Sequence, residues 1–327
     1  MTEAWSDGEG AVLRDLVEVY LTACQIEGKS SETLRSYRET LLIFLKTAQG
    51  EGLPSRPSEF TAAHVYQFLG AVRRTGASLA TQWRRQRETR TFFSWLNLHD
   101  YIPANPFQKV KNIKVPQHII HPFSGDDIAR LLEACPASTF KGARDRAIIL
   151  TLLDTGLRVG ELTALELDDL DFETQRLQVR CGKGGKGRVV RFGEQAKEAV
   201  ALYVHRFRGA EPGRLFLTCR GMPLRTNAVR TIFRDLSHKA GVDHVHPHRF
   251  RHTFATWAIE LHAREIDVQY LLGHSTPAMV RRYTATYDAE KAARAHAMFS
   301  PADHLEARLA GGAGDIPPVG PATRSGL

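Results

Sequence analysis

The stretch HPHRFRHTFATWAIELHAREIDVQYLLGHSTPAMVRRY, from His246 to Tyr283, decides the fold of the C-terminal part of the chain. Pro247 is typical of the first turn of a helix, and Gly273 is typical of a left-handed residue that ends one. His248 and Arg251 lie three residues apart, so both should project from the first turn of the first helix on neighbouring faces. We therefore expect basic side chains to gather at helix ends here, an arrangement that suits an anion.

Apolar residues in the same stretch recur at helical spacing. One face of the first helix should be buried through Phe250, Phe254, Trp257 and Leu261. Gly273 should end the second helix and lead to His274. Ser275 or Thr276 can then cap a last short helix, which Pro277 begins and which carries Tyr283.

Two motifs precede this stretch. In TGLRVGEL, residues 155–162, Thr155 and Gly156 interrupt a buried helical pattern that runs over residues 144–154, so Arg158 should lie at a turn beside a cleft. Around GKGGKGR, residues 182–188, apolar residues alternate, which predicts short strands and a flexible glycine-rich hairpin that carries Lys183. A nucleotide-binding P-loop is disfavoured, because Gly187 stands where that motif has serine or threonine.

Together these motifs resemble those of the tyrosine recombinases, also called the phage integrase family. The resemblance covers about residues 120–290 and rests on five motifs that occur in the family's order. It implies an enzyme that cuts and rejoins DNA without metal, ATP or other cofactor. The matching catalytic residues are Arg158, Lys183, His248, Arg251, His274 and Tyr283, with Glu161 in support.

The resemblance assigns a role to each of these residues. Tyr283 is the nucleophile that forms a phosphotyrosine intermediate. Arg158 and Arg251 hold the non-bridging phosphate oxygens and stabilise the charge of the transition state. Lys183 is the general acid toward the leaving 5′ oxygen, and the two histidines donate hydrogen bonds and assist proton transfer. Glu161 orients a neighbouring histidine or arginine.

Single residues also allow other interpretations. Tyr287 competes with Tyr283 as nucleophile, and the nine-residue step from His274 favours Tyr283. A metal site is disfavoured, because the nearby histidines lack an ordered spacing on one helix face and a carboxylate partner. Those histidines are His244, His246, His248 and His252.

The N-terminal part, residues 1–102, should form a four-helix domain. Apolar residues at helical spacing predict helices at about residues 11–27, from Ser30 or Ser31 onward, at 61–74 and at 78–98, where Leu79 and Trp83 begin the apolar face. This domain resembles the family's SAM-like core-binding domain. Its basic residues would contact DNA phosphates, although each helix alone could equally carry a solvated basic face. The candidate DNA-binding residues of the whole chain are Lys29, Arg35, Arg38, Arg73, Arg74, Arg84, Arg85, Arg87, Arg90, Lys186, Arg225 and Arg230.

Residues 103–122 form the expected linker, because the prolines in this region disfavour helix. Residues 123–300 form the expected catalytic domain, mainly α with a small antiparallel sheet, and begin with a capping box of Ser124 and Asp127. Helices are predicted at 195–207, 226–240, 288–299 and 303–309. A tail, residues 301–327, should be partly disordered.

Composition bounds the class of protein. A net charge of +8 over 327 residues favours a polyanionic partner. Four cysteines lie far apart without a Cys-x-x-Cys pair, which suggests neither a disulfide framework nor a zinc site. No apolar run approaches the roughly 18 residues of a membrane span. We therefore expect a cytoplasmic, nucleoid-associated protein that binds no membrane.

The resemblance further implies a homotetramer on two synapsed duplexes with inverted half-sites, strand exchange through a Holliday junction, and an accessory or second recombinase as a further partner. The chain begins with the four-helix domain, which favours an Xer-like recombinase over an integrase with an additional arm-site domain. Two alternatives are a type IB topoisomerase and a catalytically silent DNA-binding protein.

Overall fold

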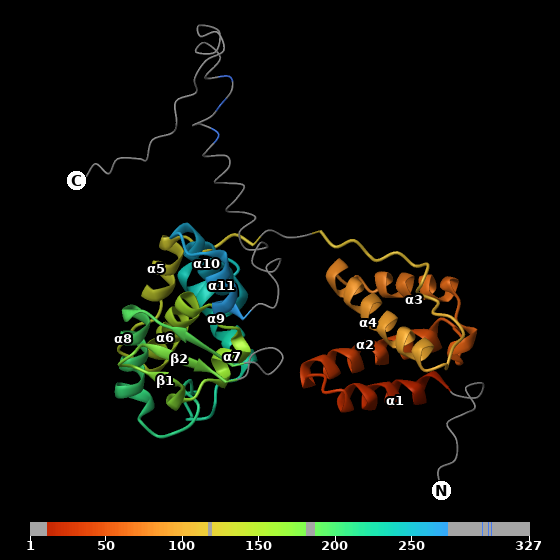
Figure 1. Cartoon of the computed structure of the whole chain (residues 1–327), viewed down its shortest axis with the longest axis horizontal. Helices are drawn as coiled ribbons and strands as arrows, with labels where there is room; N and C mark the ends of the chain where they lie inside the picture. Colours follow the sequence, from red (N-terminus) through yellow and green to blue (C-terminus); the bar gives the residue numbers. More distant parts are fainter. Residues whose placement is uncertain are drawn as a thin grey trace. The chain divides into compact units, whose positions relative to one another are not determined.

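The computed structural model describes residues 12–116, 120–180 and 187–273, together with 296, 300 and 302. The chain divides into two compact units near residue 118 (Figure 1). None of the helices in these ranges combines the length and the apolar character that crossing a membrane requires.

Over residues 12–116 the first unit contains four α-helices, as predicted. They are α1 (Leu13–Ile26), α2 (Ser31–Gly50), α3 (Ala62–Arg74) and α4 (Leu79–Leu98), with a short 3-10 turn at Pro57–Glu59. Helices α2, α3 and α4 start at hydroxyl caps, because the side chains of Ser30, Thr61 and Ser78 each accept a hydrogen bond from a main-chain N–H of the first turn. Leu79, by contrast, is 47% exposed, so the predicted apolar face of α4 begins too early.

Aromatic rings fill the core of this unit. Phe44 packs edge-on against Phe68 and Phe93, with ring centroids 5.0 and 5.7 Å apart. Phe107 and Val110, which lie in the segment assigned to the linker, are also buried in this core. Residues up to at least Val110 therefore pack with the first unit.

The second unit is mainly helical and has one small sheet (Figure 1). Its helices are α5 (Gly125–Glu133), α6 (Phe140–Thr155), α7 (Val159–Ala164), α8 (Glu194–Tyr203), α9 (Thr226–Ala240), α10 (Pro247–Glu260) and α11 (Glu265–Leu272). The capping box at Ser124 and Asp127 is present at the start of α5. Helix α8 continues as a π-helical turn over Val204–Arg208. Helix α6 lies at the centre, since it packs against both α8 and α10.

The sheet consists of β1 (Leu170–Asp171), β2 (Arg176–Val179) and β3 (Arg188–Arg191), in the order β1-β2-β3. Both pairs are antiparallel, and Leu177 on β2 faces Leu170 on one side and Val190 on the other. This confirms the expected fold class, a mainly helical protein with a small antiparallel sheet.

A tight turn between α6 and α7 brings the motifs of this unit together. Gly156 ends α6 in the left-handed region, with φ of 60°. A Cβ atom at Gly156 would lie 2.5 Å from Phe254 on α10 and 2.6 Å from Leu272 on α11, which only glycine allows. The turn therefore lies directly against the two helices of the motif-rich stretch.

The predicted apolar face of α10 is correct only in part. Phe250 is fully buried, and Phe254 and Trp257 are partly buried. Leu261 is 81% exposed, because α10 ends at Glu260 and Leu261 is already its C-cap. The apolar spacing in the sequence therefore predicts one residue too many for the buried face of α10.

Candidate active site

The structure describes four of the seven predicted catalytic residues. Arg158 is the N-cap of α7, and Glu161 lies in the first turn of that helix. His248 and Arg251 lie near the start of α10, where His248 is exposed and Arg251 is buried. The remaining predictions fall outside the described residues: Lys183, Lys186, His274, Tyr283 and the competing Tyr287, together with almost all of 288–299 and the whole of 303–309.

Three guanidinium groups converge on the C-terminal end of α11. Arg188 donates from Nε to the carbonyl of Leu271 at 2.7 Å, and Arg251 donates from Nη2 to the carbonyl of Leu272, also at 2.7 Å. Arg158 donates from Nη2 to the carbonyl of Gly273 at 3.2 Å.

The end of α11 explains why cations gather there. The last carbonyls of a helix have no partner within the helix and carry partial negative charge. Gly273, with φ of 61°, ends α11 in the left-handed conformation predicted from the sequence. The next residue in the chain is His274.

Glu161 lies at the centre of this cluster. Its carboxylate accepts hydrogen bonds from the main-chain N–H of Arg158 at 2.9 Å and from Arg158 Nη1 at 2.8 Å. It also accepts from Nη1 and Nη2 of Arg188 at 3.0 and 2.9 Å. Burial alone would raise the pKa of Glu161, but the hydrogen bonds and charges of Arg188 and Arg158 outweigh burial and hold this pKa below its usual value. Glu161 is therefore ionised at neutral pH.

The two predicted phosphate-binding arginines differ in exposure. Arg251 is only 3% exposed, and its Nη1 donates to the carbonyl of Gly156 at 2.7 Å, so it joins α10 to the turn after α6. The side chain of Arg158 is 30% exposed. Because they bind the carbonyls of the consecutive residues Leu272 and Gly273, the two guanidinium groups lie in one cluster, with Arg158 at its accessible side.

Arg188 is the member of the cluster that sequence reasoning missed. It is the last residue of the GKGGKGR motif and the first of β3, and its side chain is only 12% exposed. The only signal for it in the sequence is a basic residue at the start of a strand after a glycine-rich hairpin. Its partners lie 27 and 83 residues away along the chain, where local pattern gives no guidance.

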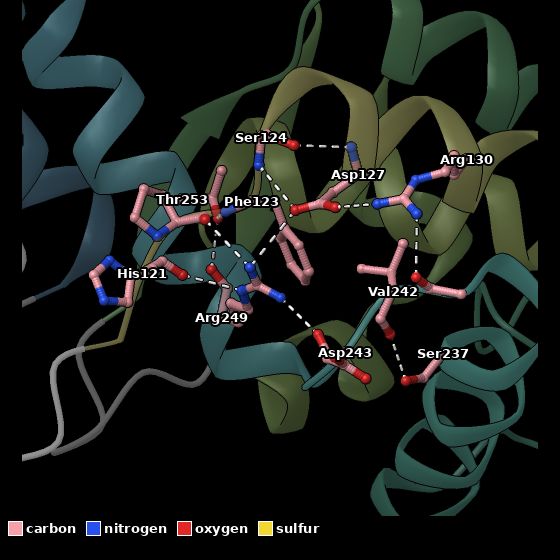
Figure 2. A network of polar contacts seen from close by, with 12 residues as sticks. His121, Phe123, Ser124, Asp127, Arg130, Ser237, Val242, Asp243, Arg249 and Thr253 are labelled. Atoms are coloured by element: carbon pink, nitrogen blue, oxygen red, sulfur yellow. Dashed lines mark hydrogen bonds and ion pairs between the residues drawn. The ribbon is translucent and has the colours of Figure 1, made fainter.

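A second network holds the start of α10 against the start of the unit (Figure 2). Arg249, which lies inside the His-x-x-Arg motif, donates to the carbonyls of His121 at 3.0 Å and Asp243 at 2.6 Å. Its guanidinium lies 4.0 Å from the centre of the Phe123 ring and 3.7 Å from the carboxylate of Asp127. The residues that enter the second unit are thereby attached to the helix that carries His248 and Arg251.

Two further histidines of α10 lie in structural positions. His246 is the N-cap and accepts a hydrogen bond from the N–H of Arg249, and burial followed by neighbouring positive charges lowers its pKa. His252 is buried beside Thr256, and burial lowers its pKa as well. Among the described residues, no three His, Cys, Asp or Glu side chains gather in a way that would hold a metal ion.

The candidate DNA-binding residues differ in how they are held. Arg84 donates to Ser36 and Glu39 on α2, and Arg90 donates to the carbonyl of Val110, so both bind parts of the first unit together. Several pair with carboxylates on the surface, namely Lys29, Arg35, Arg38 and Arg74. Arg85 is half-buried, and the exposed remainder are Arg73, Arg87, Arg225 and Arg230.

Comparison with known proteins places the chain among relatives of known family. The family model described as "Phage integrase family" matches residues 122–290. The chain is 33% identical over 259 residues to "Tyrosine recombinase XerC" of Staphylococcus carnosus, covering 78% of this chain and 86% of that protein. It is also 33% identical over 270 residues to "Tyrosine recombinase XerC" of Xanthomonas campestris pv. campestris, covering 82% and 83%.

Solved structures share the fold. A lambda integrase (75–356) dimer bound to a COC′ core site matches with a TM-score of 0.69 at 19% identity, over 84% of this chain and 95% of that one. The Tn1549 transposon integrase in complex with circular intermediate DNA matches with a TM-score of 0.66 at 22% identity, again over 84% and 95%. The family model matches more than half of the chain, and the two XerC recombinases are 33% identical to it over most of their length. The chain therefore belongs to the phage integrase family, the tyrosine recombinases.

Proposed function

We propose the following mechanism by which this chain, a site-specific DNA recombinase, breaks and rejoins DNA strands. Tyr283 gives up its phenolic proton, with one of the catalytic histidines assisting the transfer, and its oxygen attacks the scissile phosphorus while the bond from phosphorus to the 5′ oxygen breaks. Lys183 supplies the proton to that 5′ oxygen, so a 5′ hydroxyl and a 3′-phosphotyrosine form. In the second step a 5′ hydroxyl from another strand returns its proton to Lys183 and attacks the phosphotyrosine. The bond from phosphorus to the tyrosine oxygen breaks, the phenol regains its proton, and the DNA backbone is restored without ATP.

The observation that supports this proposal most is the clustering of Arg158, Arg188 and Arg251 at the end of α11, with Glu161 bound to the first two. The cluster has three guanidinium groups and one carboxylate, so its net charge is positive. His274, the next predicted catalytic residue, follows this helix end directly in the sequence. A phosphate diester bound there would be held by cations that are already ordered.

The two arginines would stabilise the charge that develops on the phosphorane. Arginine binds phosphate oxygens through two parallel N–H groups, a geometry that lysine lacks. Removing one such preorganised donor costs roughly 2.7–4 kcal/mol of transition-state stabilisation in comparable sites. Arg158 is the more accessible of the two and would make the first contact, while His248, exposed near the start of α10, would add a hydrogen bond.

The DNA substrate and the assembly follow from the same proposal. We propose double-stranded DNA with two inverted half-sites, bound by four copies of the chain, and exchange through a Holliday junction, with an accessory or second recombinase as a further partner. The fold shared with integrases solved on DNA supports the DNA partner. Exposed arginines such as Arg73 and Arg87 would contact phosphates and position the duplex, without reading its sequence. We also propose that the protein acts on nucleoid DNA in the cytoplasm.

A covalent trapping experiment tests the mechanism. Footprinting on the DNA that flanks the gene would define the site, and a nicked duplex of that site would then trap the intermediate. We expect a protein–DNA adduct that resists denaturant, disappears in Tyr283→Phe and persists in Tyr287→Phe. An adduct in Tyr283→Phe would refute the assigned nucleophile.

The same preparation separates the alternatives. A type IB topoisomerase would relax a supercoiled plasmid without exchanging strands between two defined sites, whereas we expect exchange between them. A silent DNA-binding protein would bind the footprinted site and never form the adduct.

A further inference from the structure

We propose that Arg188 is a positioning residue of the recombination reaction, which holds Glu161, and through it Arg158, together with the end of α11. The inference rests on the proposed function and adds to it a residue to which neither the motifs nor the family resemblance gives a role. Arg188 would touch neither DNA nor the nucleophile. It would act by fixing the groups that do.

Each nitrogen of the Arg188 guanidinium makes a directional hydrogen bond. Nε donates to the carbonyl of Leu271 at 2.7 Å, Nη1 to Oε1 of Glu161 at 3.0 Å, and Nη2 to Oε2 of Glu161 at 2.9 Å. The planar fork of arginine matches the two carboxylate oxygens and still reaches a third acceptor. A lysine ammonium at this position would keep the charge but could not reproduce this geometry.

Glu161 passes this constraint on to Arg158. Oε1 of Glu161 accepts from Arg158 Nη1 at 2.8 Å, and Oε2 accepts from the main-chain N–H of Arg158 at 2.9 Å. Each carboxylate oxygen is therefore shared between the two arginines. The orientation of the Arg158 side chain depends on a carboxylate whose own orientation Arg188 sets.

Charge balance leads to the same conclusion. While Arg188 shares Glu161, one carboxylate serves two guanidinium groups, and the pair of arginines retains an excess of positive charge. Without Arg188, Glu161 and Arg158 would form a neutral pair, and the attraction of Arg158 for a phosphate would fall. The loss should appear in the transition state, where negative charge on the phosphate is greatest.

Arg188 also lies close to Gly273 at the end of α11. A Cβ atom at Gly273 would stand 3.1 Å from Nη1 and 3.3 Å from Cζ of Arg188, so a side chain there would press on the guanidinium group. His274 follows Gly273 in the sequence, and Lys183 lies five residues before Arg188. Arg188 is thus the point at which β3, the strand that follows the lysine-bearing segment, is attached to the arginine cluster.

The strand itself offers a matched control. Arg191 lies on the same strand, is exposed, and donates to the side chain of Gln175 at 3.3 Å. It has the same charge and side-chain length as Arg188 but contacts neither Glu161 nor α11 in any described hydrogen bond. Arg191→Gln therefore removes one arginine from β3 without disturbing the cluster.

The test uses the full chain and the footprinted duplex described above. Single-turnover cleavage of the nicked duplex should be about 10- to 100-fold slower in Arg188→Gln, as for other residues that orient a reacting group, and within about twofold of the original rate in Arg191→Gln. Affinity for the intact duplex should change by less than about threefold in both variants, because most of it comes from other phosphate contacts. Original cleavage rates in Arg188→Gln would overturn the inference.

A modified leaving group separates positioning of Arg158 from two other roles. A duplex with sulfur in place of the scissile 5′ oxygen needs no general acid, because a thiolate leaves unprotonated. Cleavage of this duplex should be restored in Lys183→Ala but stay slow in Arg188→Gln. Restoration in Arg188→Gln would show that the residue acts through the general acid. A parallel loss of melting temperature and DNA affinity would show a merely structural role, and either result would overturn the proposal.

The conservative variant keeps the proposal testable if Arg188→Gln does not fold. Arg188→Lys preserves the charge and should still cleave about tenfold slower, because its ammonium cannot bind both oxygens of Glu161 and Leu271 together. Cleavage at the original rate in this variant would refute the inference. If the unaltered chain formed no Tyr283 adduct at all, the proposed function itself would fail, which is a different result from normal cleavage by an Arg188 variant.

Discussion

Replacing Arg249 with alanine should release the start of the second unit from α10. The Arg249 side chain, 14% exposed, donates to the carbonyls of His121, Pro122 and Asp243 at 3.0, 3.3 and 2.6 Å (Figure 2). It also packs on the ring of Phe123 at 4.0 Å. Apart from the local bond to Asp243, these contacts join segments that are far apart in the sequence.

The expected loss can be worked out from these contacts. Hydrogen bonds from a charged donor contribute about 1.5–3 kcal/mol each when buried, but these carbonyls can regain water in the variant, so we take about 1 kcal/mol each. A partly desolvated cation–π contact adds about 1 kcal/mol. Arg249→Ala should therefore destabilise the second unit by about 3–4 kcal/mol.

Amide hydrogen exchange gives a local measurement of this change. The N–H of Phe123 donates to Thr253 Oγ1 at 2.9 Å and is buried, so it exchanges only when the segment opens. A loss of about 3 kcal/mol corresponds to roughly 100-fold faster exchange, since each 1.36 kcal/mol is a factor of ten. Peptides that cover residues 121–130 should show this acceleration, and calorimetry should show a lower melting temperature for the second unit.

The matched control is Arg264→Ala. Arg264 also pairs with an aspartate, Asp267 at 2.7 Å, but on the surface, where water and salt screen the pair. We expect its melting temperature to stay close to that of the unaltered chain. If Arg249→Ala were no more destabilising than this control, or if exchange at residues 121–124 were unchanged, the network would not hold the start of the unit and the reasoning would be wrong.

Three further predictions concern other parts of the chain. Gly273→Ala should lose about 1–2 kcal/mol and cut more slowly, because its φ is +61° and a Cβ would press on Arg188, as measured by melting and single-turnover cleavage. Glu161→Gln should lose about 3 kcal/mol at neutral pH. Because the folded pKa of Glu161 lies below its ordinary 4.5, its contribution is present above pH 4.5 and is lost as pH falls through the folded value, so urea midpoints of the original and the variant should converge in acid. Gln86→Ala should expose residues 111–113 to limited proteolysis, because the Gln86 side chain donates to the carbonyl of Lys111 and accepts from the N–H of Ile113, each at 2.8 Å. An unchanged digestion pattern would contradict this.

Local signals in the sequence predicted the helices well. Ser30, Thr61, Ser78 and Ser124 cap the helices that they were expected to begin, because a cap needs only its own first turn. The left-handed end of α11 at Gly273 is equally local. These features depend on residues three or four positions apart, which a sequence displays directly.

Long-range and polar packing could not be predicted in the same way. Glu88 on α4 is buried, and Ser36 and Thr40 on α2 offset the cost of this burial by donating to its carboxylate at 2.7 and 2.5 Å. The apolar pattern of α4 gives no sign of these hydrogen bonds. Part of the buried face of α4 is therefore polar, where an apolar face was expected. Arg188 was missed for the same reason, since its partners are set by how three elements meet.

The arginine cluster shows why a helix end is a suitable place for this chemistry. Cations brought together without partners would repel one another, yet here each of Arg158, Arg188 and Arg251 is held by a carbonyl at the end of α11. The helix supplies partial negative charge in fixed positions, and Glu161 supplies one full charge. Because the guanidinium groups are ordered before DNA binds, little reorganisation would be needed when a phosphate reaches them, and that preorganisation is what makes such donors effective in a transition state. It follows that substitutions which loosen the end of α11 should slow cleavage even where they leave every arginine in place.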